Sequence, residues 1–442
     1  MLTYQNYLNA SNVEEFVIRA INEHLSSKLY NEAVIAHDYD KHQNTTIMSY
    51  QKLLYTMTGE AVPDNYSANY KLCSNFFNRF VTQENQFLLG NGVSWTDPST
   101  GEKLGDDFDT RLQELGHEAL VGGVAFGFWN FDHLEVFSVR EFVPLYDEEN
   151  GALMAGIRFW QIDRNKPLRI TLYDIDGYTN YIRKDGEIEL LSDKRPYKEL
   201  TRTTEADGTE IYAGENYPTF PIVPLFANLY KQSELVGIRE QIDAYDLIKS
   251  GFANDLDDAS QIYWLIQNGS GMDDVDLAKF LERLKVVKAA VVDDDGARAE
   301  SHTMDVPYAS REALLSRLRS DLYDDFMALD TKDIVGGATT ATQIEAAYEP
   351  LNNKADQYEY QVIDFLQGVL AVAGIDDTPS FTRSYIVNKQ EVISSLIQSA
   401  QFLEPTYIMQ KVLEVLGDGD KFEDILKQVQ ANELGALNVE EE

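Results

Sequence analysis

The chain has 442 residues, more than one compact core accommodates, and this length predicts roughly two to four folding units. Hydrophobic residues make up 44% of it and aromatic residues 11%, enough apolar material for packed interiors. Against 37 Lys and Arg stand 74 Asp and Glu, giving a formal net charge of −37. A surface this anionic repels phosphates, so the composition disfavours sequence-specific DNA binding.

Cys73 is the single cysteine, which rules out an internal disulfide and fits a reducing compartment. Because it has no nearby histidine and sits in an apolar stretch, we interpret it as a buried structural thiol. The first residues, MLTYQNYLNASNVEEF, lack the basic and apolar regions of a signal peptide. No apolar run is long enough to span a bilayer. We therefore expect an intracellular protein without membrane contact.

Three helices are predicted in the first part of the chain. Residues 13–31 place Val13, Phe16, Val17, Ala20, Ile21 and Leu25 on one stripe. A second helix is predicted over about 68–89, stopping at Gly90, and a third over 104–122, stopping at Gly122-Gly123.

From residue 124 to about 215 the sequence is rich in β-branched and aromatic residues with turn signals between the runs. This pattern predicts an antiparallel sheet built from several hairpins. The segment NYPTFPIVP follows, and its prolines Pro218, Pro221 and Pro224 predict the end of regular structure and a boundary.

Beyond the prolines the chain becomes mainly helical. Apolar residues recur at three- and four-residue steps over 235–259 and again over 310–330, which predicts two long helices. The insertion between them, 260–309, predicts a small α/β unit with strands at IYWLI and KVVKAAVV.

The segment TKDIVGGATTA, residues 331–341, separates the second long helix from a third, predicted over 342–374. Thr342 and Glu345 have the spacing of a capping box at the start of that helix. Pro350 is expected to kink the helix or to move its start to a later residue. The chain from 389 onward is predicted to be helical again.

No motif for catalysis is recognisable. Among the six histidines, His37 and His42 are the first and last residues of the segment HDYDKH. Their spacing fits neither a helical ligand pair nor a known metal pattern, so we interpret the segment as a solvated turn. Walker A, G-x-S-x-G and G-x-G-x-x-G sequences are missing. We expect no catalytic residue, no metal and no cofactor.

Four segments together resemble the portal proteins of tailed bacteriophages, of the type represented by a Bacillus siphophage portal. They are KLCSNFFNRFVTQENQFLLGNGVSW (71–95), GGVAFGFWNFDHLEVFSVREFVPLYDEENG (122–151), FPIVPLFANLYKQSELVGIREQIDAYDLIKSGFANDLDD (220–258) and ATTATQIEAAYEPLNNKADQYE (338–359). Each is loose alone, but their shared order along nearly the whole chain is fairly specific.

The resemblance implies an α+β portal fold in which a mixed wing is joined to a long helical stem, with a small α/β clip inserted and a helical crown at the end. The wing would be 1–234, the stem helices 235–259 and 310–330, and the clip 260–309. A tunnel loop, 331–341, would precede a long kinked helix returning to the wing, 342–390, and a short crown, 391–442.

The function implied by the resemblance is a structural ring, typically of twelve identical subunits, at one capsid vertex. Double-stranded DNA would pass through its channel during packaging and ejection. The terminase large subunit and a head-completion or adaptor protein would dock on it, and the major capsid and scaffold proteins would surround it. Its location would be the virion, and the host bacterial cytoplasm during assembly.

Three sets of residues are site candidates under this resemblance. Those of the tunnel loop, facing DNA, are Lys332, Asp333, Ile334, Val335, Gly336 and Gly337. Acidic candidates facing the channel from the first stem helix are Glu240, Asp243, Asp246 and Asp257, which would keep the duplex from adhering. Basic candidates between subunits at the clip are Lys279, Arg283, Lys285 and Lys288, for which solvated helix charges are an equally good interpretation.

Two other classes of function stay open at this point. One is a different virion or host interaction protein, such as a scaffold or adaptor with long helices. The other is a hydrolase that uses a divalent metal bound by Asp and Glu, which an acidic composition permits.

Overall fold

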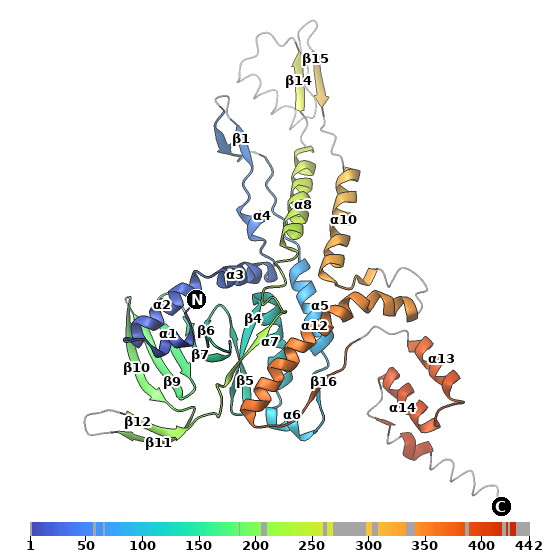
Figure 1. The fold of residues 1–442 in the computed structure, drawn as a ribbon. Helices are drawn as coiled ribbons and strands as arrows, with labels where there is room; N and C mark the ends of the chain where they lie inside the picture. The colour runs from blue at the N-terminus through green and yellow to red at the C-terminus, as the bar shows by residue number, and fades with distance from the viewer. Residues whose placement is uncertain are drawn as a thin grey trace, which may run out of the picture. The chain divides into compact units, whose positions relative to one another are not determined.

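The computed structural model describes residues 2–55, 59–64, 67–184, 186–204, 210–259, 263–267, 298–302, 308–332, 341–384, 389–417, 421–422 and 425–429. The chain divides into two compact units. The first unit comprises 1–36, 79–234 and 326–442, and the second comprises 37–78 and 235–325. Helices and strands are mixed along the chain, which confirms the predicted α+β class (Figure 1). Residues 37–78 group with the long helices, whereas the sequence analysis placed them with the rest of 1–234.

The first unit contains a five-stranded antiparallel sheet in the order β10-β9-β8-β7-β6. Its strands are β6 (Phe142–Tyr146), β7 (Leu153–Trp160), β8 (Leu168–Asp174), β9 (Gly177–Lys184) and β10 (Glu187–Arg195). Helices α1 (Tyr4–Leu8) and α2 (Val13–Leu25) cover one face of it. The predicted stripe of α2 is confirmed at Phe16, Val17, Ala20 and Ile21, which are buried against this sheet.

A second sheet of the same unit has the order β13-β4-β5. It consists of β13 (Ile222–Phe226), β4 (Val124–Asn130) and β5 (His133–Ser138). The prediction that regular structure ends at the prolines is wrong, because Pro224 lies inside β13 and pairs with Phe126. An edge strand tolerates a proline, since one side of it makes no ladder hydrogen bonds.

Two helices pack on this second sheet. Helix α7 (Phe108–Gly122) contacts β4 and β5, and α12 (Ala341–Ala373) contacts β13 and β4. Glycines allow the close approach of α12: a Cβ added at Gly127 would lie 2.6 Å from the ring of Phe365. Helix α12 begins before Thr342, so Thr342 is not its N-cap residue. The helix continues through Pro350 and changes direction along its length in Figure 1, in line with the expected kink.

Smaller elements complete the first unit. They are α6 (Ser99–Leu104), the hairpin β11 (Lys198–Thr204) and β12 (Glu210–Glu215), the pair β3 (Val93–Trp95) and β16 (Pro379–Phe381), and the helices α13 (Lys389–Ser399) and α14 (Pro405–Leu416). The two last helices agree with the predicted helical structure in the described residues after 389.

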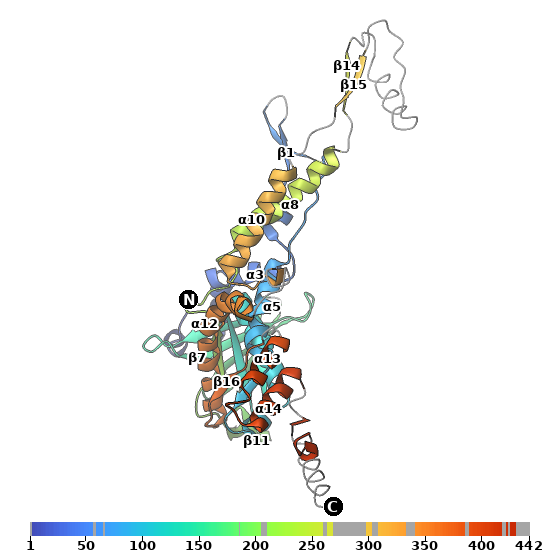
Figure 2. The same ribbon diagram turned by 90° about the vertical axis from the view of Figure 1, so that its right-hand side faces the viewer.

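The second unit is built around two long helices, α8 (Arg239–Ala259) and α10 (Tyr308–Phe326), which run alongside each other in Figures 1 and 2. It also contains α4 (Thr45–Ser49), the hairpin β1 (Leu53–Tyr55) and β2 (Ala61–Pro63), and the antiparallel pair β14 (Tyr263–Gln267) and β15 (Arg298–His302). The predicted strand at IYWLI corresponds to β14, and the segment KVVKAAVV lies outside the described residues.

Two helices, α5 and α3, each contain residues of both units. The prediction from the sequence was partly wrong for each of them. Helix α5 (Phe76–Leu89) starts well after residue 68, because residues 70–72 are not helical and the N–H groups of Tyr70 and Leu72 bond to Asn254 and Ser250 of α8. Helix α3 (Lys28–Asp40) contains His37, which is buried, so the solvated turn predicted for HDYDKH is wrong at that residue. Cys73 is half-buried rather than fully enclosed.

Candidate functional site

Helices α8 and α10 of the second unit are antiparallel and are joined near both ends. Asp255 of α8 forms an ion pair with Arg311, near the start of α10. At the opposite end Gln241 donates a hydrogen bond to Asp325. Because the bonded residue numbers run in opposite directions along the two helices, the two bridges define a common register for the pair.

Phe76, at the start of α5, packs against this pair near its Gln241 end. Its ring packs edge-on against Tyr245 of α8 with centroids 5.0 Å apart, and against Tyr323 of α10 at 6.3 Å. Edge-to-face packing of aromatic rings is favourable beyond the area buried. One aromatic side chain thus fixes the spacing of both long helices.

The four acidic candidates of α8 have different surroundings. Asp243 accepts hydrogen bonds from Tyr39 and, at 2.9 Å, from Thr46. Asp246 is fully buried and accepts a hydrogen bond from Asn44 at 2.9 Å. Its carboxylate is not available to a channel, and we leave it out of the channel-facing set. Glu240 and Asp257 are exposed.

A segment from the N-terminal part of the chain covers Asp243 and Asp246 of α8, and this explains why these two carboxylates are engaged. Asn44 is buried and caps α4 while bonding to Asp246. Burial raises the pKa of Asp246, an effect opposed by the hydrogen bonds from Asn44 and Ser74. Burial also raises the pKa of Tyr39, and its bond to Asp243 adds to the effect.

Among the loop candidates, only Lys332 is described by the structure, as an exposed residue in a helical conformation. Asp333, Ile334, Val335, Gly336 and Gly337 lie outside the described residues, as do Lys279, Arg283, Lys285 and Lys288 of the insertion. The residues on both sides of the loop are described and well anchored. Leu329 before it and Ile344 after it belong to one buried cluster with Phe87, Tyr348, Leu351 and Ala355.

The segment just before the loop is also held by paired hydrogen bonds. The side-chain amide of Gln83 in α5 donates to the carbonyl oxygen of Leu329 at 3.1 Å, and its oxygen accepts from the Leu329 N–H at 3.0 Å. On the other side, Arg383 bonds to Asn352 and pairs with Glu359 at 2.6 Å, both on α12. Both supports of the loop are therefore rigidly attached to the first unit.

A buried ion cluster centred on Lys354 of α12 was not anticipated from the sequence. Its ammonium lies 2.6 Å from Glu234 and 3.4 Å from Glu84 of α5. It also lies 3.3 Å from the ring centroid of Phe326, whose ring stacks on Phe80 at 4.8 Å. Glu234 and Phe326 flank residues 235–325 in the chain, so this cluster joins the two ends of that stretch.

The electrostatics of the cluster follow from burial of two carboxylates around one cation. Burial raises the pKa of Glu84 to about 8, with Lys354 opposing the shift and Glu234 adding to it. Burial alone would lower the pKa of Lys354, but Glu84 and Glu234 outweigh it and the pKa is raised. Lys354 is therefore charged at neutral pH, and burial favours the protonated form of Glu84.

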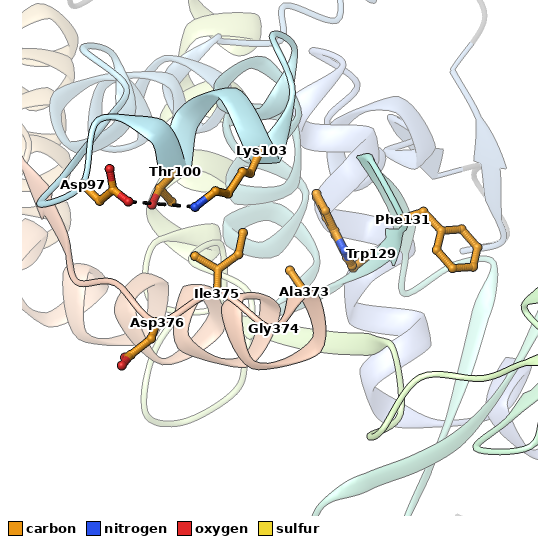
Figure 3. A pocket seen from close by; sticks show the side chains of 9 residues that line it. All are labelled: Asp97, Thr100, Lys103, Trp129, Phe131, Ala373, Gly374, Ile375 and Asp376. Carbon is orange, nitrogen blue, oxygen red and sulfur yellow. Dashed lines mark ion pairs between the residues drawn. The ribbon is translucent and has the colours of Figure 1, made fainter.

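A cavity of about 340 Å³ in the first unit lies between α6, the end of α12 and the β4–β5 hairpin (Figure 3). Lys103 and Asp97 on its rim pair at 3.9 Å, and Phe131 and Asp376 point away from the space in Figure 3. The polar groups do not converge on it, so we assign it no chemistry. Within the described part of the chain no group of three His, Cys, Asp or Glu could hold a metal ion, and no helix could cross a membrane.

The comparisons with known proteins agree along most of the chain. Residues 35–433 match the family model described as phage portal protein, SPP1 Gp6-like. The portal protein of Bacillus phage SPP1 is 24% identical over 384 residues, covering 79% of this chain and 73% of the relative. The portal protein of Clostridium phage phiCD119 is 25% identical over 312 residues, covering 64% of this chain and 66% of the relative.

Similarity to solved structures is weaker. A chain from the neck of the native GTA particle, computed with C12 symmetry, superposes with a TM-score of 0.44 at 10% identity, covering 76% of this chain and 89% of that one. A TM-score at this level does not establish a shared fold. The family match spans far more than half of the sequence, and on that ground this chain belongs to the SPP1 Gp6-like family of phage portal proteins.

Proposed function

We propose that identical copies of this chain, twelve in number, close into a ring at one vertex of a phage capsid. Double-stranded DNA passes through the central channel during packaging and ejection. The ring receives the terminase large subunit and a head-completion protein, and the major capsid and scaffold proteins surround it. The chain acts in the virion, after assembly in the host bacterial cytoplasm, and hydrolyses nothing itself.

Membership of the portal family is the observation that carries this proposal. The second unit supports it, because its long helices expose large apolar side chains that a monomer leaves in water. They include Leu247, Leu256, Tyr308 and Leu314, each at least 42% exposed. Apolar side chains exposed together on one unit are typical of protein interfaces.

The charge of the chain supports a conduit rather than a DNA-binding protein. A net charge of −37 leaves few cations to hold phosphates, and each retained phosphate contact would have to be broken as the duplex moves. Glu240 and Asp257 are exposed and Asp243 is half-buried, and these three remain the proposed channel-facing carboxylates of α8. We place Lys332 and residues 333–337 at the rim of the channel, where a Gly-Gly pair gives the backbone freedom to follow the duplex.

The proposal is tested by the mass and the shape of the purified protein. Native mass spectrometry should give one discrete high-order oligomer, and negative-stain images should show rotational symmetry around an open centre. A protein that stays monomeric at high concentration, or an assembly without a hole, would contradict the proposal. A metal-dependent hydrolysis of nucleic acid that follows the purified chain would instead favour an enzyme.

A further inference from the structure

The two long helices of the second unit present two different flanks. Each residue of an α-helix advances by about 100° around the axis. The residues that bridge α8 and α10 set the direction in which each helix faces the other. Because the helices are antiparallel, side chains rotated in the same sense from that direction lie on the same flank of the pair.

One flank, which we call the acidic flank, consists of residues rotated backward by roughly 60–140° from Gln241 on α8 or from Arg311 on α10. It contains Leu247 of α8 and Leu314 of α10, which are 42% and 46% exposed. Asp321 and Asp324 of α10 lie on it too, and Asp321 pairs with Arg317 at 2.8 Å. Asp324 is exposed.

The opposite flank, which we call the basic flank, consists of residues rotated forward by roughly 60–80° from Gln241 on α8 or from Arg311 on α10. It contains Leu256 of α8 and Tyr308 of α10, which are 52% and 63% exposed. Lys249 and Arg319 lie on it, over the rings of Tyr245 and Tyr323 respectively. Arg317, 76% exposed, also lies on the acidic flank, and exposed Glu312 lies beside the basic flank. Each flank therefore combines an apolar pair with charges, with acids in excess on the acidic flank and cations in excess on the basic flank.

We propose that the basic flank of one copy packs on the acidic flank of the next copy in the ring. The inference rests on the proposed ring and names the surfaces that close it. Contact between two different surfaces of identical subunits is a head-to-tail interface, which generates a ring when the rotation closes. Burial of the four apolar side chains supplies the attraction, and the opposed charges select the correct partner face.

The positions of the two flanks along the helices agree with this pairing. In the register set by the two bridges, Leu256 and Tyr308 lie farther from the Gln241 end than Leu247 and Leu314. Lys249 and Arg319 are likewise farther from that end than Asp321 and Asp324. Both offsets have the same direction and amount to roughly one to two helical turns. One relative tilt or shift of neighbouring helix pairs therefore aligns both the apolar and the charged groups.

Charge reversal on one flank at a time tests the pairing. The double variant Lys249→Glu with Arg319→Glu makes both flanks acidic, and Asp321→Lys with Asp324→Lys makes the acidic flank basic. Each variant alone is expected to remain monomeric by native mass spectrometry under conditions in which the wild type forms rings. An equimolar mixture of the two is expected to recover the ring, with the two variants in equal amounts.

Two controls keep the outcome interpretable. Lys28→Glu with Lys198→Glu changes the net charge as much as Lys249→Glu with Arg319→Glu does, but on the first unit, and it should leave ring formation intact. Circular dichroism should show the wild-type melting temperature to within a few degrees for each flank variant, which establishes folding. Rings that form in both variants alone, or folded variants whose mixture stays monomeric, would overturn the inference. A wild type without rings would instead defeat the proposed function.

Cross-linking gives an independent measurement in a Cys73→Ala background. With Leu314→Cys and Leu256→Cys in one chain, a short bismaleimide should link copies into a ladder ending at the full ring. Each single cysteine should give no ladder, and a mixture of the two single variants should give dimers. Strong dimerisation of Leu314→Cys by itself would mean that two acidic flanks meet, and would also overturn the inference.

Discussion

Leu329 and Ile344 lie on either side of residues 333–340 and are buried in the same cluster of side chains. Helix α5 contributes Phe87 to this cluster, and Gln83 of the same helix forms hydrogen bonds with the backbone of Leu329. Both supports of the proposed tunnel loop therefore stay in place when the loop itself changes. This allows the loop to be altered without loss of the fold.

Deletion of Ile334 to Gly337 is expected to leave the ring assembled while reducing DNA packaging. The reason is that Leu329 and Ile344 remain in their cluster on both sides of the deletion. Ring formation is measured by native mass spectrometry and packaging by nuclease protection of DNA in capsids. Failure of ring formation would show that the segment is part of the assembly rather than a loop acting on DNA.

Replacement of Lys354 by Met is expected to destabilise the protein strongly, by about 3–5 kcal/mol, because it leaves Glu84 and Glu234 without their cation. Protonation of Glu84 would reduce the loss toward the lower end of that range. Chemical denaturation measures the change in the free energy of unfolding. Lys411→Met is the matched control: Lys411 pairs with Glu414 on an exposed surface, and no measurable change is expected there. Equal effects at both sites would contradict the importance of the buried cluster.

The raised pKa of Glu84 predicts a pH dependence of stability. In the unfolded chain this carboxyl ionises near its ordinary value, whereas burial in the folded protein raises its pKa to about 8. Its contribution is therefore most favourable below the ordinary pKa and is lost as pH rises from there to about 8. The slope for one such group is at most about 1.4 kcal/mol per pH unit.

The measurement compares melting temperatures of the wild type and Glu84→Gln between pH 5 and pH 9, so that other titrating groups cancel. We expect the wild type to lose stability relative to the variant up to about pH 8 and the difference to level off above it. A constant difference across the range would mean that Glu84 keeps an ordinary pKa.

Two glycines inside helices provide a matched test of packing. A Cβ at Gly116 of α7 would lie 2.6 Å from the hydroxyl of Tyr358 and still closer to Asn85, so Gly116→Ala should cost about 1–3 kcal/mol. A Cβ at Gly251 of α8 meets no atom within 4 Å, so Gly251→Ala should stabilise the chain by up to about 1 kcal/mol. Thermal unfolding of both variants measures the contrast, and changes of the same sign would refute it.

Much of the fold was predictable because its elements have local signals. The stripe of α2, the alternation and turns of β4 to β10, and the three- and four-residue periodicity of α8 and α10 all appear in the structure. Pro224 misled the prediction because its effect depends on whether a strand lies at the edge of a sheet, and sheet order is not encoded locally.

The candidate site was less predictable, since its contacts join distant parts of the chain. Asp246 looks like one more carboxylate on a solvated helix face, and only its distant partners Asn44 and Ser74 make it a buried acceptor. Lys354 is equally inconspicuous, and its partners Glu84 and Glu234 lie far away in sequence. In a chain with 74 Asp and Glu, no local pattern distinguishes a buried carboxylate from a solvated one.

The ion cluster around Lys354 has a mechanical consequence. Residues 235–325 leave the first unit immediately after Glu234 and re-enter it at Phe326, and both residues contact the same ammonium. A pull exerted on that stretch from either end is thus delivered to one electrostatic joint on α12. The two ends of residues 235–325 therefore share the load at this one contact instead of giving way separately.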